Sequence, residues 1–140
     1  MTDFVVDTNV LMSILISGKA SYRPILTFNN FILPDFALVE IEHYKNTLRS
    51  KTKLSATQFT QWTYFVFSQL IILPQYVLAQ DSLIKSQRLL EKIDLKDISY
   101  VALAMQLDLI LLTRDNLLHE GLRKQGFRKV MLFDDFLKTL

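Results

Sequence analysis

The chain has 140 residues, half of them hydrophobic, and a formal net charge of +2, which is too weakly basic to indicate nucleic acid by itself. Ten Phe and five Tyr exclude an intrinsically disordered chain, and the lack of Cys excludes disulfides and thiolate metal sites. No apolar run reaches the roughly 18 residues of a membrane span, and no signal-peptide pattern opens the chain, so we expect a cytoplasmic protein without membrane attachment.

The first half of the chain alternates short apolar runs with helical patterns. The run Phe4–Val6 is short and rich in β-forming residues, which predicts a buried strand, and the helix after it ends near Gly18. Pro34 closes the next apolar run, and Asp35 can cap the helix that follows. In chain order we expect strand 4–6, helix 10–16, helix 21–28, strand 31–33, helix 36–48 and helix 57–68.

The second half continues this alternation. Its clearest strand is Leu109–Leu112, because a fully apolar run is typical of a parallel sheet that is buried on both faces. In chain order we expect strand 71–73, helix 77–93, helix 98–107, strand 109–112, helix 116–125, strand 129–133 and helix 134–140. Strands alternating with helices predict a single α/β domain over residues 1–140, with three α/β/α layers around a central, mostly parallel sheet.

Acidic residues stand close to the predicted ends of strands and helices. Asp7 follows the first strand, Asp115 follows the most apolar strand, Asp97 precedes a helix and Glu40 lies inside one. In a parallel sheet, the carboxyl ends of the strands carry the site. Carboxylates gathered there suit a hard divalent cation such as Mg²⁺ or Mn²⁺. Each Asp taken alone is equally well explained as a helix cap, so only the whole set favours a metal site.

Four segments resemble those of the PIN-domain family, in the family's order and over nearly the whole chain. They are the opening V-V-D-T-N, the acidic P-D-F-A-L-V-E-I-E, the segment D-L-K-D-I-S-Y-V-A-L-A, and the strand and its continuation L-I-L-L-T-R-D-N-L-L. Each is weak alone, whereas their order, spacing and strand context together are specific. The resemblance implies a nuclease that depends on Mg²⁺ or Mn²⁺, and small bacterial and archaeal members are often VapC-type toxins that cut RNA.

Matched residue by residue, the resemblance implies four acids that act both as metal ligands and as catalytic residues. These acids are Asp7, Glu40, Asp97 and Asp115. It also implies three supporting polar residues, which are Asn9, Asp94 and Thr113. Asp94 is either a fifth acid of the site or a charge at a helix N-terminus. Glu42, two residues after Glu40, remains an alternative to it. Ile98 stands where the family often has Ala, a difference that affects packing.

The resemblance therefore predicts an endoribonuclease that hydrolyses RNA phosphodiester bonds and serves as the toxin of a toxin–antitoxin pair. One alternative is a PIN-like module that binds RNA or protein without cleavage, although all four acidic positions are filled. Another is a metal-dependent phosphohydrolase, or a nuclease that acts on DNA. A D-x-D motif would favour a phosphatase, but Asp7 is followed by Thr8 and Asn9. The RNA target and the cut site stay open.

Partners are predicted from charged and aromatic residues. Arg114 and Lys96 lie next to the predicted acids and are candidates to bind neighbouring phosphates, although both are also explained as plain surface residues. The basic groups at 49–53 and 123–129 have the same ordinary explanation. Five aromatic residues of the helices suggest an apolar surface patch, which usually marks a partner: Tyr22, Phe28, Tyr64, Phe67 and Tyr76. We expect a homodimer, as the resemblance also implies, and a cognate antitoxin that covers the site.

Overall fold

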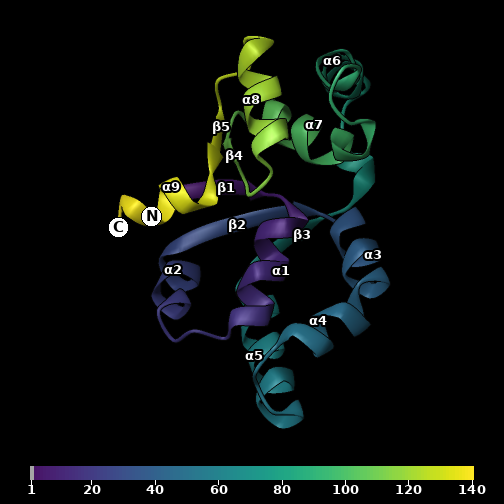
Figure 1. Cartoon of the computed structure of the whole chain (residues 1–140). Helices are drawn as coiled ribbons and strands as arrows, with labels where there is room; N and C mark the ends of the chain where they lie inside the picture. The colour runs from purple at the N-terminus through teal and green to yellow at the C-terminus, as the bar shows by residue number, and fades with distance from the viewer. Residues whose placement is uncertain (1) are drawn as a thin grey trace.

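The computed structural model describes residues 2–140, and within them a five-stranded sheet lies between layers of helices (Figure 1). The strand order is β3-β2-β1-β4-β5, and each neighbouring pair is parallel. The strands are β1 (Thr2–Val6), β2 (Asn29–Pro34), β3 (Leu70–Leu73), β4 (Ile110–Thr113) and β5 (Val130–Leu132). The predicted three-layer α/β/α fold with a mostly parallel sheet is confirmed.

Helices cover both faces of the sheet. One side carries α1 (Thr8–Ser17), α2 (Tyr22–Phe28), α3 (Phe36–His43), α4 (Lys45–Lys51) and α5 (Ala56–Ser68). The other side carries α6 (Gln80–Leu90), α7 (Ile98–Leu107) and α8 (Asn116–Lys124), with the 3-10 turns η1 (Gln75–Val77) and η2 (Leu95–Asp97) before α6 and α7. The chain ends in α9 (Phe133–Lys138). No helix within residues 2–140 has the length and apolarity that crossing a membrane requires.

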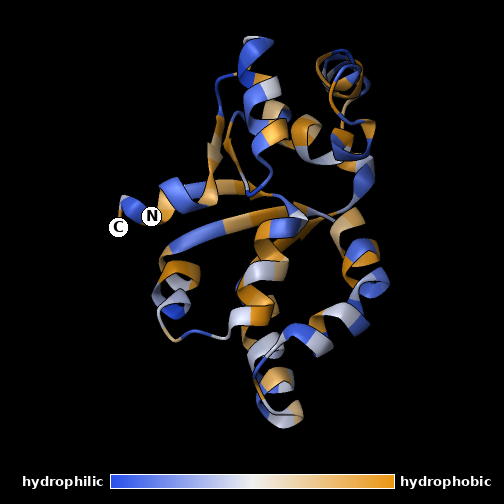
Figure 2. Cartoon of the chain, in the orientation of Figure 1, coloured by the Kyte–Doolittle hydropathy of each residue, from blue (hydrophilic) through white to orange (hydrophobic). Residues whose placement is uncertain are grey.

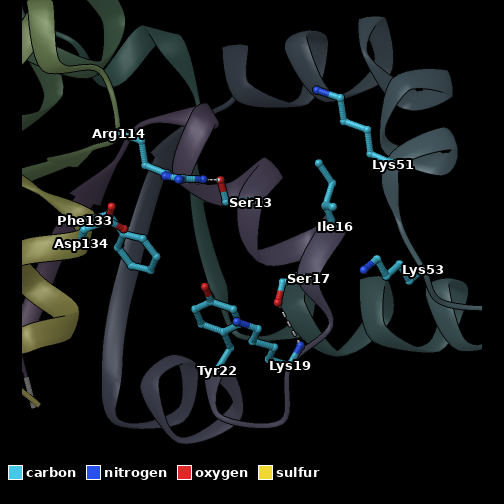
Figure 3. A pocket seen from close by; sticks show the side chains of 10 residues that line it. All are labelled: Ser13, Ile16, Ser17, Lys19, Tyr22, Lys51, Lys53, Arg114, Phe133 and Asp134. Carbon is cyan, nitrogen blue, oxygen red and sulfur yellow. Dashed lines mark hydrogen bonds between the residues drawn. The ribbon is translucent and has the colours of Figure 1, made fainter.

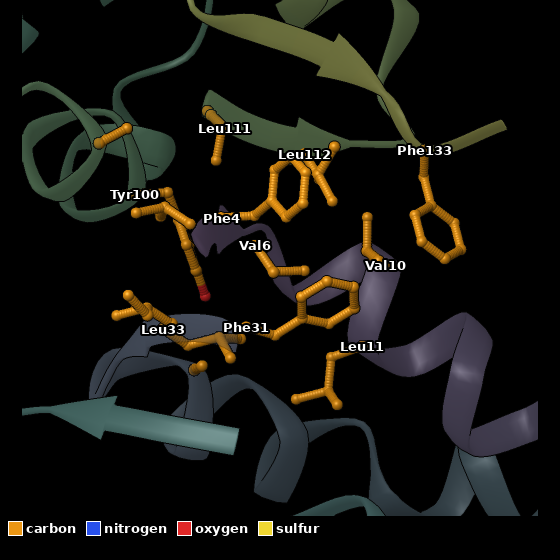
Figure 4. Close-up of a cluster of buried hydrophobic side chains, with 14 of the residues drawn as sticks. Phe4, Val6, Val10, Leu11, Phe31, Leu33, Tyr100, Leu111, Leu112 and Phe133 are labelled. Atoms are coloured by element: carbon orange, nitrogen blue, oxygen red, sulfur yellow. The ribbon is translucent and has the colours of Figure 1, made fainter. Parts of the chain in front are cut away.

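The core lies on both faces of the central strand β1, because successive side chains of a strand point to opposite faces. Apolar residues are concentrated on the strands and on the inner sides of the helices (Figure 2). On one face, Phe4 and Val6 pack in a cluster with Phe31 of β2 and Leu11 of α1 (Figure 4). Phe136 of α9 closes this cluster, with its ring 4.9 Å from that of Phe4. These contacts fix β1 at the centre of the molecule.

The helix expected over 36–48 is divided in two, which corrects the prediction. Tyr44 leaves the helical conformation (φ −98°, ψ 10°) and separates α3 from α4. Neither Gly nor Pro marks the break in the sequence. The reason is tertiary: the turn allows α4 to pack on α1, where Leu48 is buried. Burial of that side chain favours the divided helix.

The helix expected over 77–93 is shorter at both ends than predicted. Residues 75–77 form η1, the next two residues are extended, and α6 covers only Gln80–Leu90. The side chain of Gln106 on α7 accepts a hydrogen bond from the backbone N–H of Ala79 and donates one to the carbonyl of Val77. These contacts satisfy backbone groups that a helix would otherwise use, so the chain stays extended there.

Gly18 ends α1, as predicted from its position. Its φ of 62° lies in the left-handed region, and its N–H donates to the carbonyl of Ile14. A Cβ added to Gly18 would lie 2.5 Å from Leu54, so both the backbone conformation and the space favour glycine. The chain can thus turn sharply from α1 into α2.

Candidate active site

The carboxyl ends of β1 and β4 meet at one edge of the sheet and bring the first and last predicted acids together. In the register of the two strands, Val6 is opposite Leu112, and the backbone N–H of Asp7 donates to the carbonyl of Leu112 at 2.9 Å. Thr113 ends β4, and Asp115 follows two residues later. The topology expected from the sequence therefore places Asp7 and Asp115 at the same edge.

Asp7 is a buried carboxylate held by polar neighbours. Its Oδ2 accepts hydrogen bonds from the hydroxyl of Thr113 at 2.9 Å and from Nδ2 of Asn9 at 3.3 Å. Burial raises the pKa of Asp7 from 3.8 to about 6; the Thr113 hydroxyl opposes this shift, and the negative charge of Glu40 adds to it. Asp7 precedes α1, yet its side chain makes no capping hydrogen bond. The backbone N–H groups of Asn9 and Thr8 at the start of α1 nevertheless lower its pKa, so the helix start helps to hold this carboxylate.

Asp97 stands before α7 and is only 5% exposed. It occupies the N-cap position without a side-chain capping bond, and its Oδ2 is buried with no hydrogen-bond partner among residues 2–140. The pKa of Asp97 is raised from 3.8 to about 7, mainly by burial and then by the charges of Asp7 and Asp94, while Lys96 opposes the shift. A buried carboxylate oxygen without a partner is costly and calls for a functional explanation.

Glu40 faces the interior side of α3, whereas Glu42 does not. Oε1 of Glu40 accepts a hydrogen bond from the hydroxyl of Thr8 at 3.0 Å and another from the hydroxyl of Tyr100. Glu42 is exposed and forms an ion pair with Lys45 at 2.7 Å. Of the two alternatives, the geometry places Glu40 beside Asp7 and turns Glu42 away.

Asp115 and Asp94 do act as caps. Oδ1 of Asp115 accepts from the N–H of Leu118 in the first turn of α8, and Oδ1 of Asp94 accepts from the N–H of Lys96 in η2, both at 3.1 Å. The charges of both acids still reach Asp97 and raise its pKa. Of the two alternatives for Asp94, the charge at a helix N-terminus agrees with the structure. Asp115 caps a helix and also lies beside the buried acids.

The acids interact electrostatically in pairs. Their side chains do not form the single metal-ligand cluster that the sequence predicts. Within residues 2–140, no three Asp, Glu or His side chains are close enough to form a complete ligand group. Electrostatic coupling links Asp7 to Glu40, and links Asp97 to both Asp7 and Asp115. The donors nevertheless fit a hard divalent cation, because they are all oxygen and the buried Oδ2 of Asp97 lacks a partner.

The sequence prediction missed Tyr100 as a residue of this site. Its ring is fully buried, and its hydroxyl contacts both Thr8 and Glu40. Burial and the hydrogen bond to Glu40 raise the pKa of Tyr100, which keeps the phenol a donor. A signal was present in the spacing, because Tyr100 follows Asp97 by three residues and so shares its side of the helix start.

The match to a family model decides the classification. The model of the PIN domain matches residues 5–133. The chain belongs to the PIN-domain family. PIN domains are nucleases that generally use a divalent metal, and their model spans all four acids described above. Comparison with curated proteins gives no match.

Solved PIN-like structures share the fold at low sequence identity. PAE2754 from Pyrobaculum aerophilum has a TM-score of 0.70 and 14% identity, covering 99% of this chain and 88% of its own. VapBC2 from Rickettsia felis, bound to a DNA fragment from its promoter, has a TM-score of 0.61 and 15% identity, covering 93% and 96%. A toxin–antitoxin complex from Klebsiella pneumoniae has a TM-score of 0.56 and 21% identity, covering 91% and 94%. These likenesses establish the shared fold.

Proposed function

We propose that this PIN domain is a Mg²⁺- or Mn²⁺-dependent endoribonuclease and the toxin of a toxin–antitoxin pair. One observation carries the nuclease proposal: the buried carboxylates of Asp7 and Asp97 repel each other, neither takes part in an ion pair within residues 2–140, and Oδ2 of Asp97 has no hydrogen bond there. Such an arrangement is unfavourable for the folded protein alone, and a cation supplies the missing charge.

The residues that would hold the cation are Asp7, Glu40, Asp97 and Asp115. When bound, a divalent cation lowers the pKa of an attacking water and offsets charge on the phosphate. The protein's contribution is orientation. Thr113 and Asn9 fix the carboxylate of Asp7, while Tyr100 and Thr8 fix that of Glu40. Hydrolysis joins a water oxygen to phosphorus and breaks one P–O ester bond, so no side-chain nucleophile is needed.

The partner proposal rests on the structural neighbours and on exposed aromatic residues. Two of the similar structures are a VapBC complex and a toxin–antitoxin complex. Of the five aromatic residues expected at the surface, Phe28, Tyr64 and Tyr76 are exposed, whereas Tyr22 and Phe67 are half-buried and pack on the core. Exposed aromatic surface of this kind supports an antitoxin partner and a homodimer.

The test of the proposed function is cleavage of total cellular RNA, which offers many sequences and folded structures. We expect RNA loss with Mg²⁺ or Mn²⁺ and none in excess EDTA. Asp97→Asn is expected to lower the rate by more than the roughly 10- to 100-fold typical of outer-shell changes at metal sites. Asp81→Asn is the matched control, because it removes a carboxylate from an exposed residue of α6 whose charge is not among those that shift the pKa of Asp97. RNA loss that continues in EDTA, or equal rates for both variants, would contradict the proposal.

A further inference from the structure

A basic pocket lies beside the acidic site, between α1, the start of α2, the connection from α4 to α5, and the start of α9 (Figure 3). Its volume is about 440 Å³, which lies within the range of roughly 300–1,000 Å³ for pockets that hold small molecules. The charged residues that line it are Lys19, Lys51, Lys53, Arg114 and Asp134. Four cations thus face one carboxylate, so the pocket attracts anions.

Within the described part of the chain, the cations of the pocket are not neutralised by ion pairs, unlike five lysines elsewhere on the surface. Five ion pairs occur within residues 2–140, and they involve Lys45, Lys85, Lys96, Lys129 and Lys138. None of the four pocket cations takes part in these pairs. Lys51 and Lys53 are exposed and stand opposite Arg114 across the opening. Their charge is therefore free to act on a ligand.

Arg114 connects the pocket to the acids. Its guanidinium donates a hydrogen bond to Ser13, which lines the pocket, and its backbone N–H donates to Oδ1 of Asn9 at 3.0 Å. The amide of Asn9 in turn donates to Asp7. The basic pocket therefore begins one residue from Asp115. An anionic polymer with one phosphate at the acids would place a neighbouring phosphate among the cations.

The wall of the pocket also offers an aromatic surface. Tyr22 is half-buried and stacks on Phe133, with ring centroids 6.2 Å apart and an angle of 20° between the planes. This contact fixes the ring of Tyr22 next to the cations. Cations along the backbone and aromatic rings for unstacked bases are the combination by which proteins bind single-stranded nucleic acid.

We propose that this pocket binds the backbone of single-stranded RNA next to the phosphate that is cut. Lys51 and Lys53 contact phosphates, Tyr22 contacts an unpaired base or ribose, and Arg114 guides the strand toward the acids. The inference rests on the proposed ribonuclease function, because it takes RNA as the substrate. It adds the direction in which the strand leaves the acidic site, along α1 toward the connection between α4 and α5.

The experiment measures binding without cleavage. A fluorescent single-stranded RNA of mixed sequence is titrated with protein in excess EDTA, and the anisotropy is followed at several salt concentrations. Each phosphate contact releases counterions from the single strand. It adds about 0.7 to the slope with which the logarithm of the association constant falls against the logarithm of the salt concentration. Lys51→Gln/Lys53→Gln should therefore lower the slope by about 1.4 and weaken binding on the order of 25-fold near 0.1 M salt.

The matched control is Arg123→Gln/Arg128→Gln, which removes the same charge from exposed residues at and beyond the C-terminal end of α8, on the side of the amino ends of the strands. We expect this control to bind RNA within about twofold of the unchanged protein. Equal affinities of the two double variants would overturn the proposal. So would a Lys51→Gln/Lys53→Gln protein that keeps its RNA affinity but loses binding to a fluorescent polyglutamate peptide, since the pocket would then serve an acidic protein segment.

The outcome is separable from that of the proposed function. RNA binding in EDTA requires neither a metal nor cleavage. If the protein binds RNA through the pocket but never cleaves it, the proposed RNA-binding pocket stands and the proposed nuclease function is contradicted. If the protein cleaves RNA with Mg²⁺ but Lys51→Gln/Lys53→Gln leaves its RNA affinity unchanged, the proposed nuclease function stands. The proposed RNA-binding pocket is then contradicted.

Discussion

At the scale of single residues, Asp97 combines burial with a charge that no neighbour fully balances. Its pKa is about 7 in the folded protein, against 3.8 for an ordinary Asp. Between these two values, the folded state binds more protons than the unfolded state. The contribution of Asp97 to the free energy of unfolding of the metal-free protein therefore falls as the pH rises from about 4 to 7. The contribution of this residue to stability is present at low pH and lost above pH 7.

Asp97→Asn should remove much of this pH dependence. In EDTA at pH 8, the variant is expected to be more stable than the unchanged protein by on the order of 1 to 2 kcal/mol, a figure discounted for contact with solvent. At pH 4 the two should be nearly equal. Urea unfolding at both pH values measures the difference. Asp81→Asn is the control, since it removes an exposed carboxylate whose charge is not among those that shift the pKa of Asp97. A variant whose stability falls with pH as steeply as the unchanged protein would refute the role of Asp97.

At the scale of the elements, one hydrogen-bonded group joins three helices. Thr8 begins α1, Glu40 lies on α3 and Tyr100 lies on α7. Their side chains contact one another in a partly buried cluster. Because α1 and α7 lie on opposite faces of the sheet, the cluster ties the two helical layers together at the carboxyl edge.

Tyr100→Phe should loosen this connection while the ring keeps its place in the core. Loss of the hydroxyl leaves Glu40 and Thr8 with one contact fewer, which we expect to lower the free energy of unfolding by about 1 to 2 kcal/mol. Cleavage should also slow, because Glu40 is held less firmly. Tyr76→Phe, at a residue 87% exposed, is the control and should change neither quantity. Unfolding and RNA cleavage of both variants measure the effect, and equal behaviour of the two would rule it out.

The sequence predicts which strand ends carry the site better than it predicts the side-chain contacts within the site. Asp7 and Asp115 could be placed at one edge because apolar runs precede them and parallel strands end together. The spacing from Asp97 pointed to Tyr100, but its contact with Glu40 could not be predicted, because that contact depends on how α3 packs. The break at Tyr44 was not predicted for the same reason. No residue near Tyr44 in the sequence causes the break, which results from the burial of Leu48 against another helix.

At the scale of the whole molecule, exposed aromatic residues lie on several elements. Phe28 on α2, Tyr64 on α5 and Tyr76 on η1 are 66%, 73% and 87% exposed. Phe28 also lines an apolar groove of about 560 Å³ together with Leu137 and Leu140. Surfaces of this kind favour association in water.

We therefore expect a homodimer at micromolar concentration. Sedimentation equilibrium over a concentration series measures the mass directly, and twice the 16.3 kDa of the chain is the expected result. Dilution should shift the equilibrium toward the monomer, which distinguishes a dimer from an elongated single chain. A mass of 16.3 kDa at every concentration would contradict the prediction.

The bond between Thr113 and Asp7 joins residues 106 positions apart, so the site closes only when β4 docks on β1. A growing polypeptide contains Asp7 and Glu40 long before Thr113 and Asp115 have been added. Until then, the edge of β1 that receives β4 is bare, and Asp7 lacks the hydroxyl that orients it. The acidic site is therefore incomplete as long as β4 has not been added to the growing chain. The order of the strands thus delays completion of the acidic site until β4 has been made.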